Sequence, residues 1–196
     1  MNSKVKLYIL LTDTGTLLTR LIKLYTKAPF NHASIAFDHE LKNLYSFGRK
    51  KPNNPLIAGF VKENIQSRLF RKAKCALYCL PLDKEVYEKV YEFVKTFEKN
   101  RHIYKYNLLG LLGVMAKIDV KRKNAYFCSQ FVSYVLKQNG INIVDKPCVF
   151  TTPSDIGNSS LLKLLYTGKL CDYKPELFCE NISSNLSNMP LSNTIA

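Results

Sequence analysis

The chain has 196 residues, of which 46% are apolar and 12% aromatic, so it is long and hydrophobic enough to bury the core of one domain. Its 29 basic and 15 acidic residues give a formal charge of +14, which attracts anionic partners without indicating a fold. The basic residues recur in short groups rather than in one block, and no nucleic-acid-binding signature is present, so a specific nucleic-acid partner is not expected.

The six cysteines are expected to be reduced thiols of a cytoplasmic protein. The sequence begins MNSKVKLYILLTDTG, where the apolar run is only a few residues long and no small-residue cleavage site follows. Without an export signal, disulfides are not expected. Cys75 and Cys79 share one side of a predicted strand, but no second ligand pair or nearby histidine completes a metal site, so neither a metal nor another cofactor is expected.

The first half of the chain is predicted to be rich in strands. A helix is expected at residues 17–27, where apolar residues recur with helical spacing before Pro29. Residues 32–38 and 43–50 are strand candidates joined by the polar connection HELK, which is typical of a hairpin. The other predicted strands are KVKLYILLT (residues 4–12), LIAGFVKE (56–63) and KCALYCLPL (74–82).

Two amphipathic helices are predicted in the second half. Asp83 is positioned to cap the first, residues 84–100. The second lies within AYFCSQFVSYVLKQNG, residues 125–140, with Asn124 as its expected N-cap and Gly140 as its C-terminal cap. Its apolar face comprises Cys128, Phe131, Val132, Val135 and Leu136. Between the helices, the uncharged run YNLLGLLGVMA is too short to cross a bilayer and is expected to form an apolar loop.

The mixture of central strands with flanking helices indicates a single α+β domain over residues 1–175. Residues 176–196 are rich in Ser and Asn and short of core residues. We therefore expect them to form a loose C-terminal tail.

Cys128 is a candidate nucleophile. A thiol reacts as its thiolate, and the N-terminus of a helix lowers the thiol pKa through unpaired backbone N–H groups and the helix dipole. The predicted helix places Cys128 within about its first turn. The alternative is that Cys128 is a small apolar residue of the core, because unmodified cysteines are commonly buried and inert.

His32 is the candidate general base. In HASIAF, Ala33, Ile35 and Phe37 alternate onto an apolar face, while His32, Ser34 and Ala36 point the other way. That second face is small beyond His32, which leaves room for another element to approach closely. A histidine there can take the proton from a cysteine and return it to a leaving group; the alternative is a histidine hydrogen-bonded at a strand edge.

A third residue usually fixes the orientation of the imidazole. Ser46 is predicted to share a face with His32 across the hairpin, and its hydroxyl can accept a hydrogen bond from the ring. Asp38, at the strand end, is the alternative. His39 and His102 are expected at the surface.

These stretches resemble the circularly permuted branch of the NlpC-type papain-like superfamily, which includes proteins similar to lecithin retinol acyltransferase. Members place a strand histidine first and a helix-borne cysteine, typically in a phrase like CSxxV, near the C-terminal end. Here NHASIA matches the histidine segment and CSQFV the cysteine segment. The pair Tyr106 and Asn107 also falls where relatives often carry an aromatic-polar pair, and the similarity in order and spacing spans about residues 5 to 175.

The resemblance implies a papain-like fold, a central antiparallel sheet or half-barrel with the cysteine helix packed against it. It also implies a thiol hydrolase that cleaves an amide (peptide-type) bond through a thioester on Cys128, with His32 as base and then acid. Relatives usually offer His, Asn, Gln or Glu at the third position, where this chain offers Ser46.

Two alternatives remain open. The first is an acyltransferase or lipid-ester hydrolase of the same fold that acts on an acylated substrate in peripheral contact with an anionic membrane. The second is a non-catalytic binding module whose basic surface engages phosphates.

Overall fold

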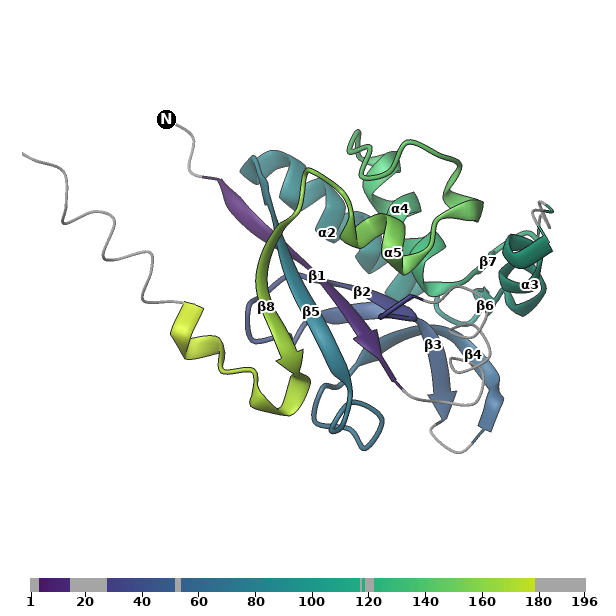
Figure 1. The fold of residues 1–196 in the computed structure, drawn as a ribbon. Helices are drawn as coiled ribbons and strands as arrows, with labels where there is room; N and C mark the ends of the chain where they lie inside the picture. Colours follow the sequence, from purple (N-terminus) through teal and green to yellow (C-terminus); the bar gives the residue numbers. More distant parts are fainter. Residues whose placement is uncertain (1–3, 15–27, 52–53, 117, 119–121, 179–196) are drawn as a thin grey trace, which may run out of the picture.

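The computed structural model describes residues 4–14, 28–51, 54–116, 118 and 122–178. In this part of the chain, an α+β fold is built on a six-stranded antiparallel sheet with the strand order β4-β3-β2-β1-β5-β8 (Figure 1). Its strands are β1 (Val5–Asp13), β2 (His32–Ala36), β3 (Leu44–Lys51), β4 (Asn54–Glu63), β5 (Lys74–Leu82) and β8 (Lys163–Lys169).

Helices cover one face of this sheet, and a small two-stranded parallel sheet lies beside it (Figure 1). The helices among the described residues are α2 (Lys84–Lys99), α3 (Leu108–Ala116), α4 (Cys128–Gln138) and α5 (Pro153–Gly157). The small sheet consists of β6 (Lys105–Tyr106) and β7 (Ala125–Tyr126). Single 3-10 turns form η1 (Cys148–Phe150), η2 (Leu170–Asp172) and η3 (Pro175–Phe178). No helix in the described ranges is long and apolar enough to span a bilayer.

The central strands of the main sheet are buried on both faces. On the helix side, Ile35 and Phe47 join one core with Phe97 of α2 and Phe131 of α4. On the opposite side, a second core contains Leu10, Ala36, Leu41, Leu44, Phe70, Ala73, Cys75, Leu77, Leu170 and Tyr173. Successive side chains of a strand point to opposite faces, so each central strand contributes to both cores.

The predicted strands are confirmed with shifts of one or two residues at their ends, and the hairpin of β2 and β3 forms as predicted. The predicted helix at residues 17–27, and the tail beyond residue 178, lie outside the described residues. Asp83 does precede α2, although its side chain makes no capping hydrogen bond. The run expected as an apolar loop is instead the helix α3.

The predicted start of the cysteine helix was wrong. Asn124 adopts a left-handed backbone conformation, with φ of 54°, and the short strand β7 separates it from α4. Asparagine tolerates this conformation, so it forms a turn here rather than a cap. The predicted end is confirmed: Gly140 has φ of +80°, and the N–H groups of Gly140 and Ile141 close a Schellman motif on Lys137 and Leu136.

Candidate active site

Cys128 is the first residue of α4, closer to the helix start than the sequence predicted. Phe127 precedes it with an extended backbone; its carbonyl accepts the first helical hydrogen bond, from Phe131 N–H at 2.9 Å. The Phe127 N–H points toward the Gln130 side chain, 3.4 Å from Oε1. The apolar face of α4 packs on the sheet, and the Cys128 side chain lies beside the start of β2, next to His32 and Ala33.

The pKa of the Cys128 thiol is lowered even though the residue is only 5% exposed. Burial disfavours the thiolate, but a hydrogen bond from His32, the positive charge of that ring, and the backbone N–H groups of Ala33 and Ser129 together outweigh it. The sulfur therefore lies where four separate interactions favour its negative form. Burial without such partners, as at an ordinary core cysteine, would instead favour the neutral thiol.

Cys75 shows the contrast within the same chain. Burial, with a smaller effect from Cys171, raises the pKa of Cys75 to about 12. Burial also raises the pKa of Cys79. Both remain protonated at neutral pH, in agreement with their interpretation as packing residues.

The ring of His32 is held between Cys128 and Glu63. Its Nε2 lies 2.8 Å from Glu63 Oε1, which leaves Nδ1 as the ring nitrogen available to the sulfur. Burial disfavours the charged ring, but the negative charge of Glu63 and the contact with Cys128 raise the pKa of His32 well above its ordinary value. His32 and Cys128 thus stabilise each other as imidazolium and thiolate.

Glu63 is the residue that the sequence prediction missed. It ends β4, its side chain is 6% exposed, and its second oxygen accepts a hydrogen bond from the Ser34 hydroxyl at 2.5 Å. A Cβ atom at Gly48 would lie 3.6 Å from both the His32 ring and Glu63, an ordinary van der Waals distance, so the backbone of β3 passes directly beside the pair. The signal in the sequence was the alternation of β4, which puts Glu63 on the face opposite to the core residue Phe60.

Ser46 lies elsewhere in the network than predicted. It is buried, and its hydroxyl donates to the Ala33 carbonyl at 2.7 Å, a bond that ties β3 to β2. The alternative, Asp38, accepts N–H bonds from Lys42 and Asn43 and so closes the hairpin turn. The structure therefore brings Cys128 and His32 together, and the group on the far side of the ring is Glu63.

The β4–β5 connection, rather than α4, covers the face of β2 that carries His32 and Ala36. α4 packs on the face of Ala33 and Ile35, whereas Ala36 belongs to the core that contains Phe70 and Ala73 from the connection between β4 and β5. The Phe70 ring lies 6.4 Å from the His32 ring. The close approach predicted for this face is thus made by the β4–β5 connection.

Tyr106 lies near the sulfur, on β6, which runs beside β4. Burial, followed by the nearby Cys128, raises its pKa, and the charge of Arg49 opposes this only in part. Tyr106 thus keeps its phenolic proton and can donate a hydrogen bond. Its neighbour Asn107 is 1% exposed and caps α3 by accepting the Gly110 N–H at 2.9 Å.

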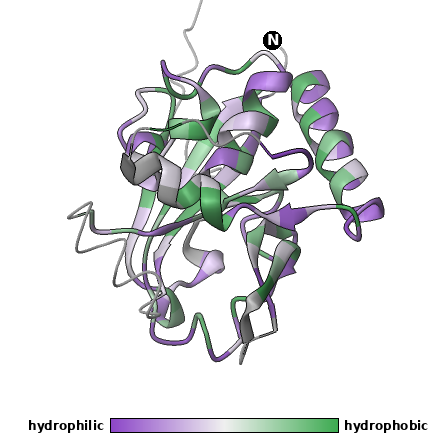
Figure 2. Ribbon diagram, turned by 90° about the vertical axis from the view of Figure 1, so that its right-hand side faces the viewer, coloured by the Kyte–Doolittle hydropathy of each residue, from purple (hydrophilic) through white to green (hydrophobic). Residues whose placement is uncertain are grey.

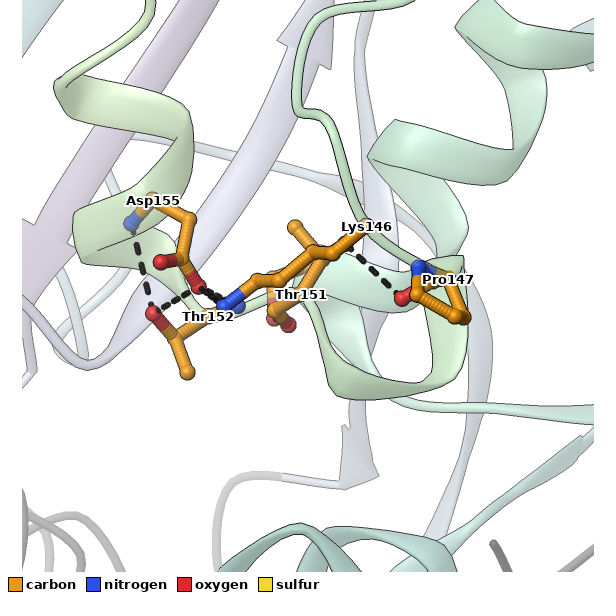
Figure 3. A network of polar contacts seen from close by, with 6 residues as sticks. Lys146, Pro147, Thr151, Thr152 and Asp155 are labelled. Carbon is orange, nitrogen blue, oxygen red and sulfur yellow. Dashed lines mark hydrogen bonds and ion pairs between the residues drawn. The ribbon is translucent and has the colours of Figure 1, made fainter.

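The connection after α4 is fixed to the residue next to the nucleophile. The buried Ser129 hydroxyl donates to the Thr151 carbonyl at 2.7 Å. Figure 3 shows how the following turn is held: Lys146 and Thr152 both reach Asp155, at 2.5 Å each, and Thr152 caps α5. This network supports Ser129, whose backbone N–H faces the sulfur.

No group of three or more His, Cys, Asp or Glu side chains suited to a metal ion occurs in the described part of the chain. In comparisons by sequence, neither a protein-family model nor a curated protein matches the chain. The site combines a cysteine of lowered pKa at a helix start, a histidine beside it, and a carboxylate behind the histidine.

Proposed function

We propose that this protein is a cysteine hydrolase that cleaves an amide (peptide-type) bond through a thioester intermediate. One observation carries the proposal: the continuous contact from the Cys128 thiol to His32 and on to Glu63. A nucleophile, a base and a group that orients the base form the arrangement of nucleophilic catalysis on many unrelated folds.

In the first half-reaction, the Cys128 thiolate attacks the substrate carbonyl and forms a C–S bond. The His32 imidazolium then donates its proton to the leaving nitrogen, the C–N bond breaks, and an amine departs. In the second half-reaction, neutral His32 takes a proton from water, whose oxygen attacks the thioester. The C–S bond breaks, the acid product leaves, and the thiolate–imidazolium pair is restored.

Two groups are positioned to stabilise the oxyanion that forms on the carbonyl oxygen. The first is the backbone N–H of Cys128, which is unpaired within α4 because it lies in the first helical turn. The second is the Tyr106 hydroxyl, which keeps its proton close to the sulfur. Glu63 does not touch the substrate in this scheme; it is a positioning residue that orients the ring and favours its charged form.

The resemblance of NHASIA and CSQFV to the permuted NlpC-type papain-like branch supports the same roles for His32 and Cys128. The antiparallel sheet with α4 packed on it is compatible with that fold. Glu63 also supplies one of the residue types that relatives usually offer as the third group.

A second candidate is an acyltransferase or lipid-ester hydrolase. It shares the acylation of Cys128 but differs in the bond that is cleaved or in the group that accepts the acyl chain. The observation in its favour is the exposed Leu108 and Leu109 of α3, which follow Tyr106 closely in the chain.

Trapping the acyl-enzyme tests the proposal and separates the two candidates. In Cys128→Ser, an acyl group would be held as an oxygen ester, which is slower to hydrolyse than a thioester. After exposure to a mixed lysate, intact-mass and peptide mass spectrometry should find a peptidyl or similar amide-derived acyl group at position 128. A fatty acyl group there would favour the second candidate; the absence of any adduct, with no labelling preference for Cys128 in the natural chain, would contradict both.

A further inference from the structure

Exposed apolar side chains gather around α3. Seven large apolar residues in the described part of the chain are more than a third exposed, and four of them fall within residues 103–118. These are Ile103 (43% exposed), Leu108 (36%), Leu109 (55%) and Ile118 (59%). In Figure 1, α3 lies outside the layers formed by the main sheet and α2, and Figure 2 views the molecule from this side.

Basic side chains surround the same helix. Residues 99–123 contain seven Lys or Arg and a single acidic residue, Asp119. Arg101, Lys105, Arg122 and Lys123 are exposed. The pairing of β6 with β7 brings these basic residues together. The Lys105 N–H donates to the Asn124 carbonyl at 2.9 Å, so the segment that precedes α3 lies beside the segment that follows it. Lys50 of β3 adds a further cation, with its Nζ 3.4 Å from the Arg101 carbonyl.

We propose that this surface, made of α3 and the exposed basic residues of segments 101–105 and 122–123, docks on a bilayer that contains anionic phospholipid. A helix that carries leucines and no charge can enter the boundary between headgroups and acyl chains, while flanking lysines and arginines contact the phosphates. A nucleic acid would use the cations but leave the leucines exposed. A second copy of the chain would bring two like-charged surfaces together.

Docking of α3 on a membrane would also restrict the substrates that reach Cys128, and this consequence rests on the proposed function. α3 begins two residues after Tyr106, whose ring lies near the Cys128 sulfur. Docking through α3 would hold the thiol close to the membrane surface. A membrane-resident molecule then becomes the class of substrate to which Cys128 has access.

Vesicle sedimentation of the full chain carrying Cys128→Ala tests the docking without any dependence on catalysis. Sucrose-loaded vesicles of phosphatidylcholine with about 30% phosphatidylserine should pellet the protein, while vesicles of phosphatidylcholine alone should bind it on the order of tenfold less. Leu109→Gln should weaken binding by about tenfold. Leu164→Gln is the matched control, because Leu164 is also 55% exposed but lies on β8; it should bind like the parent.

The contribution of the basic residues to vesicle binding is tested with a second variant and its matched control. Arg122→Gln combined with Lys123→Gln should weaken binding to the anionic vesicles by about tenfold or more. Arg71→Gln combined with Lys72→Gln removes the same charge from exposed positions of the β4–β5 connection and should have a much smaller effect. Circular dichroism of each variant verifies that the fold is retained.

The proposal is overturned if no vesicle pellets the parent, or if each α3 variant behaves like its matched control. It is also overturned if Leu109→Gln leaves vesicle binding intact and instead converts a dimer to a monomer in sedimentation velocity. Failure of the proposed hydrolase would show differently, as unselective alkylation of Cys128 in solution, where no vesicle is present.

Discussion

Glu63 Oε1 lies 2.8 Å from Nε2 of His32, although the two residues belong to strands that are separated in the sheet by β3. The same carboxylate receives the Ser34 hydroxyl, so it is held from two points of β2. The position of Glu63 behind the His32 ring is therefore fixed.

Iodoacetamide should label Cys128 ahead of the more accessible Cys148 and Cys171 at about pH 6, by on the order of tenfold or more, because an ordinary thiol is almost fully protonated there. The lowered pKa of Cys128 extends its thiolate form to lower pH than that of an ordinary thiol. Peptide mass spectrometry of a timed reaction provides the rates. Equal or slower labelling of Cys128 would contradict the assignment, and His32→Ala should abolish the preference.

Hydrolytic activity should follow a bell-shaped dependence on pH. Activity rises as Cys128 ionises, and this limb lies below the ordinary thiol range because its pKa is lowered. Activity falls as His32 loses its proton, and this limb lies above the ordinary imidazole range because its pKa is raised. The pH dependence of kcat/KM on the substrate class found by trapping measures both limbs; an alkaline limb near that of free imidazole would contradict the pairing with Glu63.

Glu63→Gln keeps the size of the side chain but removes its charge, so the pKa of His32 should fall and the alkaline limb should move toward acid. We expect kcat/KM to drop on the order of a hundredfold to ten-thousandfold, as for other groups that orient a catalytic histidine. Glu92→Gln, at an exposed position of α2, is the control. An unshifted pH profile would show that Glu63 has only a structural role.

Tyr106→Phe should lower kcat by on the order of tenfold to a hundredfold with little change in KM, because the hydroxyl is proposed to act on the oxyanion. Alkylation of Cys128 forms no oxyanion, so its rate should stay within about twofold. Tyr104→Phe is the control, since this ring stacks on Phe97, with centroids 4.5 Å apart. A loss of alkylation together with activity would instead indicate damage to the thiol environment.

Gly110→Ala tests the cap of α3. A methyl group there would fall 2.1 Å from Nδ2 of Asn107, so the alanine should displace the cap and lower the free energy of unfolding by about 1–2 kcal/mol in urea titrations. Asn107→Ala removes the same cap. The double variant should cost less than the sum of the two single changes, because the clash and the cap involve the same side chain; strict additivity would contradict this account.

The sequence predicted those parts of the site that depend on local pattern. Helical spacing placed Cys128 on α4, and strand alternation placed His32 opposite to Ala33 and Ile35. Alternation along β4 places Glu63 opposite to Phe60, but its contact with His32 depends on the register of β3 against β4, in which Leu44 faces Glu63. Local sequence does not fix such a register.

The start of α4 and the state of α3 were misjudged for related reasons. Asn124 is a residue type common both at helix caps and in left-handed turns, and the tertiary pairing of β7 with β6 selects the turn. The run LLGLLGVMA lacks a polar face, so periodicity did not distinguish a helix from a loop. The Asn107 cap, which depends on backbone geometry, marks its start.

His32 and Cys128 are separated by nearly half of the polypeptide, and the thiol owes its low pKa to the ring and to the amide of Ala33. An unfolded chain, or a nascent one that has not yet emerged past α4, carries an ordinary cysteine at position 128. Alkylation of Cys128 below the pH at which an ordinary thiol ionises therefore counts native molecules, and it can follow refolding in a mixture without a spectroscopic probe.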